Sequence, residues 1–296
     1  MKKINLALLF SLFYCPLFAQ QIADTAFSFK IKKPAYPYGQ GPVIALDQAH
    51  LNFHTLDGRY ASFGKILKND GYQLKANKKE FSVQSLAFIQ ILVIANALGE
   101  DGPWVLPTKP AFSKKEIEAV TEWVKNGGSL FLFSDHMPFA GAAAGLAEAF
   151  GFKCYNGFAI KKNQQPEIFS KGNHLLETSI FTEGREPTDS LFFFTGQAFE
   201  APVGAKIISR LDSSYFCYLP EKAWEFNDST PSRSGDGLVN GAFMEIGKGR
   251  VVIMGEAAMF SAQLAGPGQQ KIGMNHPQAR HNAQFLLNLI HWLDKK

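Results

Sequence analysis

The residues with the clearest chemical use are concentrated between positions 47 and 60. This stretch holds two carboxylates, two imidazoles, two amides and a guanidinium. Carboxylates and imidazoles transfer protons and bind divalent cations, whereas amides and guanidinium groups hold polar or anionic ligands through hydrogen bonds. The side chains that we single out are Asp47, His50, Asn52, His54 and Arg59. The presence of so many such side chains in one short stretch predicts a ligand site, but it does not identify a reaction.

The same stretch begins where a buried β-strand ends, and three further strands end in a similar way. Continuous apolar runs flanked by Gly, Asp or Asn are typical of strands buried on both faces, and they occur at 42–46, 91–95, 129–133 and 249–255. The last three runs are followed by Asn96, Asp135, His136 and Glu256. Because the carboxyl ends of parallel strands share one edge of a sheet, where open α/β sheets bind ligands, we expect all these side chains to converge.

One chemistry that this set allows is metal binding. Neutral imidazoles and carboxylates are suitable ligands for zinc, manganese or another divalent ion. The ligands that we predict for such an ion are His50, His54, Asp135 and His136. The spacing Asp-x-x-His-x-x-x-His at 47–54 matches no closed structural zinc pattern, so the spacing does not identify the metal.

A second chemistry is acid and base catalysis without a metal. A pair such as Asp47 with Asp135 or Glu256 can divide the two roles if its surroundings separate the two pKa values, as in glycoside hydrolysis. The catalytic candidates are Asp47, His50, Asp135, His136 and Glu256. The alternative is a hydrogen-bonded network that braces the strand ends. Nucleophilic catalysis has little support, because Gly-x-Ser-x-Gly is absent and no cysteine occupies the turn after 129–133.

Amide, guanidinium and aromatic side chains supply candidate substrate contacts. The polar candidates are Asn52, Arg59, Asn96, Gln263 and Asn275. The aromatic candidates lie in or beside long loops and either stack on sugar rings or pack on the sheet edge; they are Trp104, Tyr218, Trp224 and Phe226. Gln263 and Asn275 also have a structural alternative, because they can tie the last helix and the loop before it to the sheet.

Helical segments alternate with the apolar runs. Residues 59–70, 140–150 and 277–293 have helical spacing, and the capping box Ser113-Lys114-Lys115-Glu116 opens a further helix. This alternation predicts an α/β fold with a mostly parallel sheet and helices on both faces. From 152 to about 247, short aromatic strands and long loops predict a β-rich extension.

The N-terminal residues and the composition indicate where the protein acts and which partners it has. Residues 1–19 combine two lysines, an apolar run and a final alanine, which is typical of a secretory signal peptide. We therefore expect an exported, periplasmic or extracellular protein with one domain, 20–296, and no transmembrane segment. Loss of the leader lowers the formal charge from +4 to about +2, which gives no reason to expect nucleic acid as a partner. Cys154 and Cys217 then remain, either as a disulfide or as two free thiols.

Three segments resemble the class I glutamine-amidotransferase-like superfamily. They are GGSLFLFSDH at 127–136, GRVVIMG at 249–255 and NAQFLLNLIHWL at 282–293. Together they look like an uncharacterised, secreted bacterial branch of that superfamily, related to domains in gliding-motility and intraflagellar-transport proteins. The resemblance implies a flavodoxin-like sheet. Amidotransferases carry a catalytic cysteine after the strand that here ends at Phe133, where this chain has Asp135 and His136, so glutaminase activity is not implied.

These observations lead to two functional expectations. The first is an exported hydrolase with a polar cleft, with or without a metal ion, that acts on a glycan-derived or other small polar substrate. The second is a non-catalytic module of the cell envelope that binds carbohydrate or protein, in which the same residues only form hydrogen bonds. A shared site requires that His50, Asp135 and Glu256 point to one open position.

Overall fold

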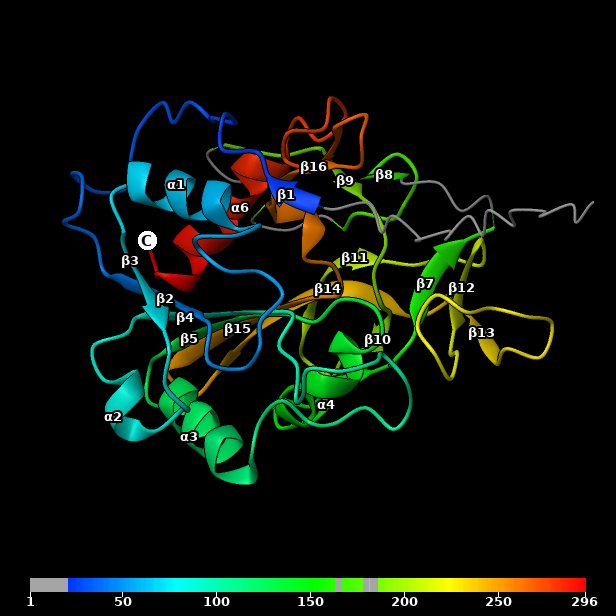
Figure 1. The fold of residues 1–296 in the computed structure, drawn as a ribbon. Helices are drawn as coiled ribbons and strands as arrows, with labels where there is room; N and C mark the ends of the chain where they lie inside the picture. Colours follow the sequence, from blue (N-terminus) through cyan, green and yellow to red (C-terminus); the bar gives the residue numbers. More distant parts are fainter. Residues whose placement is uncertain (1–20, 163–166, 178–180, 182–185) are drawn as a thin grey trace, which may run out of the picture.

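The computed structural model describes residues 21–162, 167–177, 181 and 186–296, and the expected signal peptide, residues 1–19, lies outside them. A nine-stranded sheet crosses the molecule (Figure 1). Its path is β3 (Gln73–Asn77), β2 (Val43–Asp47), β4 (Ile91–Ala95), β5 (Ser129–Phe133), β15 (Gly249–Met254), β14 (Val239–Ile246), β10 (Phe199–Glu200) and β6 (Lys153–Cys154), and β11 (Lys206–Arg210) pairs with β14. The first five strands of this path are parallel, and the others pair in antiparallel fashion. The predicted mostly parallel α/β sheet is confirmed.

The register of the parallel strands brings their carboxyl ends side by side. Phe133, the last residue of β5, pairs with Ala95 of β4 on one side and with Met254 of β15 on the other. β4 and β5 are buried along their whole length, which explains why they are continuous apolar runs in the sequence. The polar residues that follow β4, β5 and β15 therefore start from one edge of the sheet, as predicted.

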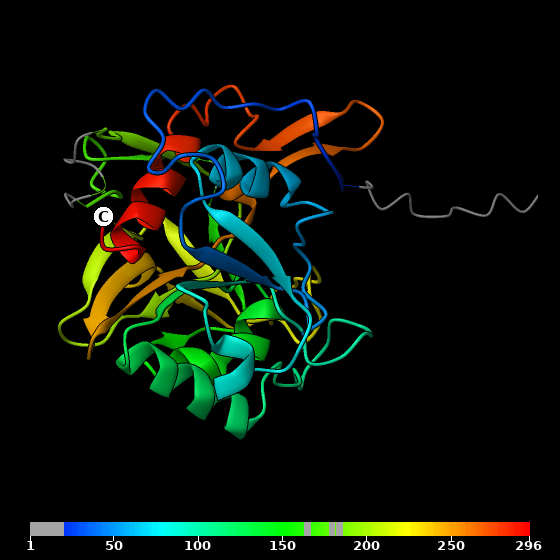
Figure 2. The ribbon, with the colours of Figure 1, turned by 90° about the vertical axis from the view of Figure 1, so that its left-hand side faces the viewer.

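Helices cover both faces of the sheet (Figures 1 and 2). On one face lie α1 (Ala61–Asn69) and α6 (Asn282–Leu293), and on the other lie α2 (Val83–Leu86), α3 (Lys114–Lys125) and α4 (Phe139–Glu148). The predicted capping box opens α3, since Ser113 and Glu116 each accept the other's backbone N–H through the side chain. α6 begins later than predicted, because residues 277–281 form turns before the helix.

The predicted β-rich extension is also present. Its strands are β7 (Phe158–Lys161), β12 (Tyr215–Tyr218) and β13 (Ser232–Ser234) in one sheet, and β8 (Glu167–Ser170) and β9 (Ser190–Phe193) in another. A third small sheet, which the sequence did not indicate, joins β1 (Gln21–Ala23) to β16 (Ala262–Ala265) and β17 (Gln270–Gly273), the two strands that follow the 3₁₀ helix η1 (Ala258–Phe260). No helix within the described ranges is long and apolar enough to cross a membrane.

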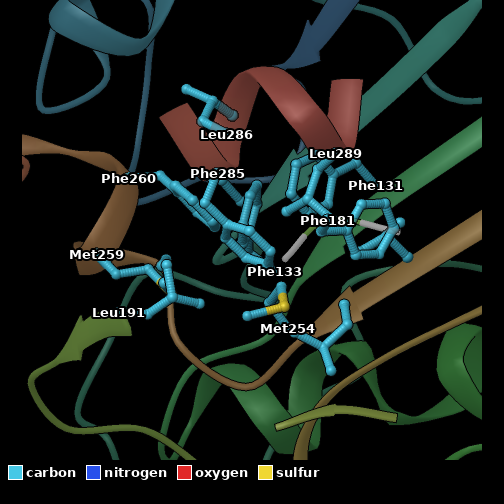
Figure 3. Packing of buried hydrophobic residues seen from close by; sticks show 14 of the residues in the cluster. Phe131, Phe133, Phe181, Leu191, Met254, Met259, Phe260, Phe285, Leu286 and Leu289 are labelled. Atoms are coloured by element: carbon cyan, nitrogen blue, oxygen red, sulfur yellow. The ribbon is translucent and has the colours of Figure 1, made fainter. Parts of the chain in front are cut away.

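An aromatic core joins β5 to α6 beneath the carboxyl edge (Figure 3). The rings of Phe131 and Phe133 on β5 have centroids 4.2 Å apart. Phe260 of η1 lies 5.5 Å from Phe133 and 6.0 Å from Phe285 of α6. All four rings are fully buried, so the strand ends that carry the polar residues rest on a closely packed base.

Candidate functional site

Asp47 and His50 lie in a closed network with Glu116 of α3. His50 Nδ1 is 2.8 Å from Asp47 Oδ2, and His50 Nε2 is 2.7 Å from Glu116 Oε1. The imidazole also packs against the rings of Phe81 and Phe112, with centroids 4.7 and 4.8 Å away. All three ionisable side chains are buried. Because carboxylates occupy both ring nitrogens, His50 has no free nitrogen for a metal ion or a substrate.

The two carboxylates favour a protonated His50. Burial lowers the pKa of His50, but the hydrogen bonds and charges of Asp47 and Glu116 outweigh burial and raise that pKa above 6.5. Burial likewise raises the pKa of Glu116, and hydrogen bonds from Ser113, His50 and Phe81 outweigh it and lower that pKa below 4.5. The ring thus links the end of β2 to the start of α3. Asp47 and His50 fit the bracing alternative and not the predicted catalytic position.

Asp135 and Glu256 follow the adjacent strands β5 and β15. Asp135 accepts the N–H of the next residue through Oδ1 (2.8 Å) and the N–H of Ala257 through Oδ2 (3.3 Å). Glu256 accepts two backbone N–H groups, at 2.9 and 3.1 Å. Asn96, a predicted substrate contact, accepts the backbone N–H of Asp135 through Oδ1 (3.1 Å). The edge of the sheet therefore holds these two carboxyl groups in fixed orientations.

The surroundings raise the pKa of both carboxyl groups. Glu256 is fully buried, and burial together with the nearby charge of Asp135 raises the pKa of Glu256 well above 4.5. Burial also raises the pKa of Asp135, although the His136 side chain and several hydrogen bonds offset part of that rise. Both groups therefore keep a proton to a higher pH than an exposed carboxyl group does. Two such carboxyl groups can act as an acid and a base when their surroundings give them different pKa values.

A small cavity lies beside Glu256. Its volume is about 40 Å³, and its walls include Lys161, Glu167, Tyr215 and Asn240. The Tyr215 hydroxyl donates to Glu167 Oε2 (2.7 Å), and Glu167 also pairs with Lys161. Asn240 Oδ1 is buried without a hydrogen-bond partner. This volume is sufficient for ordered water. The cavity thus leaves room for water, and places polar side chains, next to the Glu256 carboxyl group.

Tyr60 connects His54 and Arg59 to the same edge. The Tyr60 hydroxyl donates to the Ala257 carbonyl (2.9 Å), and its ring stacks on His54 with centroids 4.6 Å apart. Burial and the charge of Arg59 lower the pKa of His54 to about 3, so the imidazole is neutral. The Arg59 guanidinium lies 3.8 Å from the centre of the Phe53 ring. The loop before α1 is therefore fixed against the turn that follows β15.

His136 lies among aromatic rings. Its Nδ1 donates to the Met137 carbonyl (2.7 Å), its ring stacks on Phe158 at 4.6 Å, and Trp224 is 4.7 Å away. Phe226 contacts Phe158 at 5.2 Å. The side chains of Trp224 and Phe226 are 52% and 41% exposed. We call the group of His136, Phe158, Trp224 and Phe226 the aromatic surface.

The remaining predicted contacts have structural partners. Asn275 Nδ2 donates to Asp24 Oδ2 and to the Gln263 carbonyl, both at 2.9 Å, and Gln263 Nε2 donates to a serine two residues earlier at 2.7 Å. These bonds join β16 to the segment after β1, so the structural alternative describes this pair. Asn52 Oδ1 accepts the His50 N–H (3.1 Å), whereas Asn52 Nδ2 is buried without a partner.

The described residues do not form a metal site. No three His, Cys, Asp or Glu side chains among them are grouped so as to hold an ion. His50 is occupied by two carboxylates and His136 lies among aromatic rings, so the four predicted ligands are not brought together. This donor set does not fit zinc or manganese, and no step below is assigned to a metal.

Cys154 and Cys217 are free thiols, so of the two alternatives the disulfide is not formed. Burial raises the pKa of each thiol to about 11. Because the thiolate is the reactive form of cysteine, neither residue is a nucleophile at neutral pH.

Sequence reasoning missed several residues of this region. Glu116 is recognisable in the sequence only as a helix cap, and its bond to His50 spans 66 positions. Tyr60 lies within the stretch 47–60, and its position directly after the candidate residue Arg59 could have indicated that it belongs to this region. Lys161, Glu167 and Tyr215 of the cavity walls come from short strands of the extension, which have no distinctive motif. A larger hollow of about 590 Å³ between residues 31–35 and α6 contains none of the predicted site residues.

Comparisons with known proteins give structural matches. No family model matches the chain, and no curated protein matches it significantly. The N-terminal domain of mmIFT52 is 13% identical over 85% of this chain and 97% of its own length, with a TM-score of 0.60. ThuA-like proteins of Bacteroides uniformis and Parabacteroides merdae are 13% and 11% identical, cover 90% and 86% of this chain and 94% and 90% of their own, and both have a TM-score of 0.46.

These similarities concern the fold alone. The match to the mmIFT52 domain extends over nearly the whole of that domain and agrees with the sheet described above. ThuA-like proteins have a class I glutamine amidotransferase-like fold, but TM-scores below 0.5 add no argument of their own. The parallel strands, the sheet order and the helices on both faces define a flavodoxin-like α/β protein.

Proposed function

We propose that the protein is an exported hydrolase that acts on a glycan-derived or other small polar substrate. The observation that carries this proposal is the buried carboxyl pair at the ends of β5 and β15. Burial raises the pKa of both groups, and the charge of Asp135 adds to the rise at Glu256. We further infer a secreted bacterial branch of the amidotransferase-like fold, in which Asp135 and His136 stand where a catalytic cysteine would follow β5.

In this mechanism Glu256 is the acid and Asp135 is the base. Glu256 donates its proton to the leaving oxygen while the bond from carbon to that oxygen breaks. Asp135 takes a proton from the attacking water, whose oxygen forms the new bond to carbon. Proton exchange through water then returns the pair to its starting state. The cavity has room for a water molecule beside the acid Glu256, and Lys161, Glu167 and Tyr215 provide its polar walls.

A substrate screen tests the proposal. The mature protein, residues 20–296, is incubated with nitrophenyl glycosides and end-labelled oligosaccharides, with and without EDTA. We expect product release from at least one sugar and the same rate after chelation, because both proton-transferring groups are carboxyls. Absence of release across the panel contradicts a glycan hydrolase. Loss of release in EDTA with recovery in zinc or manganese contradicts the metal-free mechanism.

The aromatic surface favours a second candidate function, a non-catalytic carbohydrate-binding module. Trp224 has a positive φ of 67°, which is uncommon for a bulky residue, and its indole is half exposed beside Phe158. Exposed aromatic rings provide flat apolar faces on which sugar rings can stack.

For this candidate we expect W224A to weaken binding of an oligosaccharide roughly tenfold, because one stacking face is lost. Binding is measured by isothermal titration calorimetry. Phe88 is the matched control, since it also has a positive φ, 66°, and is 94% exposed, but lies outside the aromatic surface. Equal losses in F88A and W224A would contradict a specific stacking site.

A further inference from the structure

The loop between β2 and α1 holds three buried polar atoms without a hydrogen-bond partner. They are Asn52 Nδ2, His54 Nδ1 and Arg59 Nε. His54 is only 2% exposed, so bulk water does not satisfy its free nitrogen. Buried polar atoms are nearly always paired in folded proteins, and each exception calls for a ligand, an ordered water or another physical explanation. Three exceptions within one short loop indicate a prepared set of hydrogen-bonding groups.

Arg59 adds a positive charge that no carboxylate balances. Among the described residues it forms no ion pair, and its one hydrogen bond runs from Nη1 to the Phe53 carbonyl at 3.2 Å. Arg250 provides a contrast, because it also lies over an aromatic ring, that of Trp292 at 4.8 Å, yet it pairs with Glu245 at 2.9 Å. A half-buried cation without a counter-charge favours the binding of an anion.

The charge of the set limits the kind of anion. The pKa of His54 is lowered to about 3, so His54 adds a hydrogen-bonding nitrogen but no charge. One guanidinium, one amide and one neutral imidazole match a group with a single negative charge and two acceptor oxygens. A carboxylate has this form and pairs with two N–H groups of arginine at once. A phosphate dianion would remain partly uncompensated by a single cation.

The loop is held next to the carboxyl pair. Tyr60, directly after Arg59, bonds to the Ala257 carbonyl at 2.9 Å, and its ring stacks on His54. The Arg59 guanidinium is itself fixed over the Phe53 ring at 3.8 Å. A ligand group bound by this loop would therefore be placed at the same edge of the sheet as Glu256.

We propose that Asn52, His54 and Arg59 recognise the carboxylate of an acidic sugar, such as a uronic acid. Arg59 pairs with the two carboxylate oxygens, Asn52 Nδ2 donates a further hydrogen bond, and His54 Nδ1 donates as the neutral tautomer. This inference rests on the proposed function for the sugar part of the ligand and adds the acidic group. It makes uronides the first members of the substrate panel to examine.

The test compares methyl β-glucuronide with methyl β-glucoside, which differ at one position by a carboxylate and a hydroxymethyl group. Binding to the mature protein is measured by isothermal titration calorimetry. We expect the glucuronide to bind roughly tenfold or more tightly, because a charge-assisted pair is added. Raising the salt concentration should weaken the glucuronide more than the glucoside.

Three variants locate this preference and separate it from catalysis. R59Q should reduce the preference for the glucuronide to near unity, whereas R250Q, which removes another stacked arginine, should retain it. The preference should also persist in E256Q, because binding does not require hydrolysis. A failed activity screen with an intact glucuronide preference would overturn the hydrolase and leave the recognition site in place.

Several outcomes would overturn the recognition site itself. One is that the mature protein binds the two glycosides equally, or binds neither of them. Another is an unchanged preference in folded R59Q, as judged by circular dichroism. Tighter binding of inorganic phosphate than of the glucuronide at the same loop would replace the carboxylate assignment with a general anion site. Full retention of the preference in N52A and H54A together would limit recognition to Arg59 and contradict the three-residue site.

Discussion

Replacement of Glu256 with glutamine is expected to lower hydrolysis by roughly 10²–10⁴-fold, the usual contribution of a general acid. Glutamine has nearly the same shape as glutamic acid but supplies no proton to the leaving oxygen. The rate of the best substrate from the screen is measured for the wild type and E256Q. The Michaelis constant should change little, because Glu256 is buried and contributes to proton transfer more than to binding.

The pH profile distinguishes this role from a structural one. Because the pKa of Glu256 is raised well above 4.5, the wild-type rate should fall only as the pH rises through that raised pKa, where the acid loses its proton. E256Q should lack this alkaline limb. E245Q changes an exposed glutamate and should leave the rate unchanged. A folded E256Q enzyme with the wild-type rate and profile would remove Glu256 from the mechanism.

Replacement of His50 with alanine is expected to destabilise the protein by about 3–5 kcal/mol. The change leaves Asp47 and Glu116 as two buried carboxylates without the imidazolium that joins them. It also empties the space between the rings of Phe81 and Phe112. The free energy of unfolding is measured with urea, and H174A, which removes an exposed histidine, is the control. A loss below about 1 kcal/mol would contradict a bracing role.

The same network gives stability a defined pH dependence. The pKa of His50 is raised above 6.5 in the folded state, so its contribution is fully present below pH 6.5 and is lost as the pH rises through the folded value. The pKa of Glu116 is lowered below 4.5, so its contribution is present above pH 4.5 and is lost as the pH falls through its folded value. Stability from this network should therefore be greatest between these limits, and H50A should lack the alkaline decline.

The sequence was a reliable guide to the central strands and a weaker guide to side-chain partners. β4 and β5 occupy the predicted residues, because strands buried on both faces leave unbroken apolar runs. The common edge of the sheet followed from their parallel order. β3 was missed, because its half-exposed sequence QLKAN lacks such a run.

The sequence predicted the edge of the sheet at which the candidate residues lie, but not which of their side chains contact one another. His50 and Asp135 both follow parallel strands, yet one bonds to an acid on α3 and the other faces the turn after β15. Strand order specifies which ends are neighbours, whereas rotamers and loop conformations decide which side chains meet. The position of His136 depends on Trp224, whose long loop could not be placed from the sequence.

The two borders of the main sheet have a consequence for assembly. β6, at one border, contains only two residues, and β3, at the other, exposes Gln73 and Lys75 to solvent. Short strands and charged side chains discourage a foreign strand from pairing with an open sheet edge. The two ends of this strand path are thus unfavourable sites for edge-to-edge aggregation.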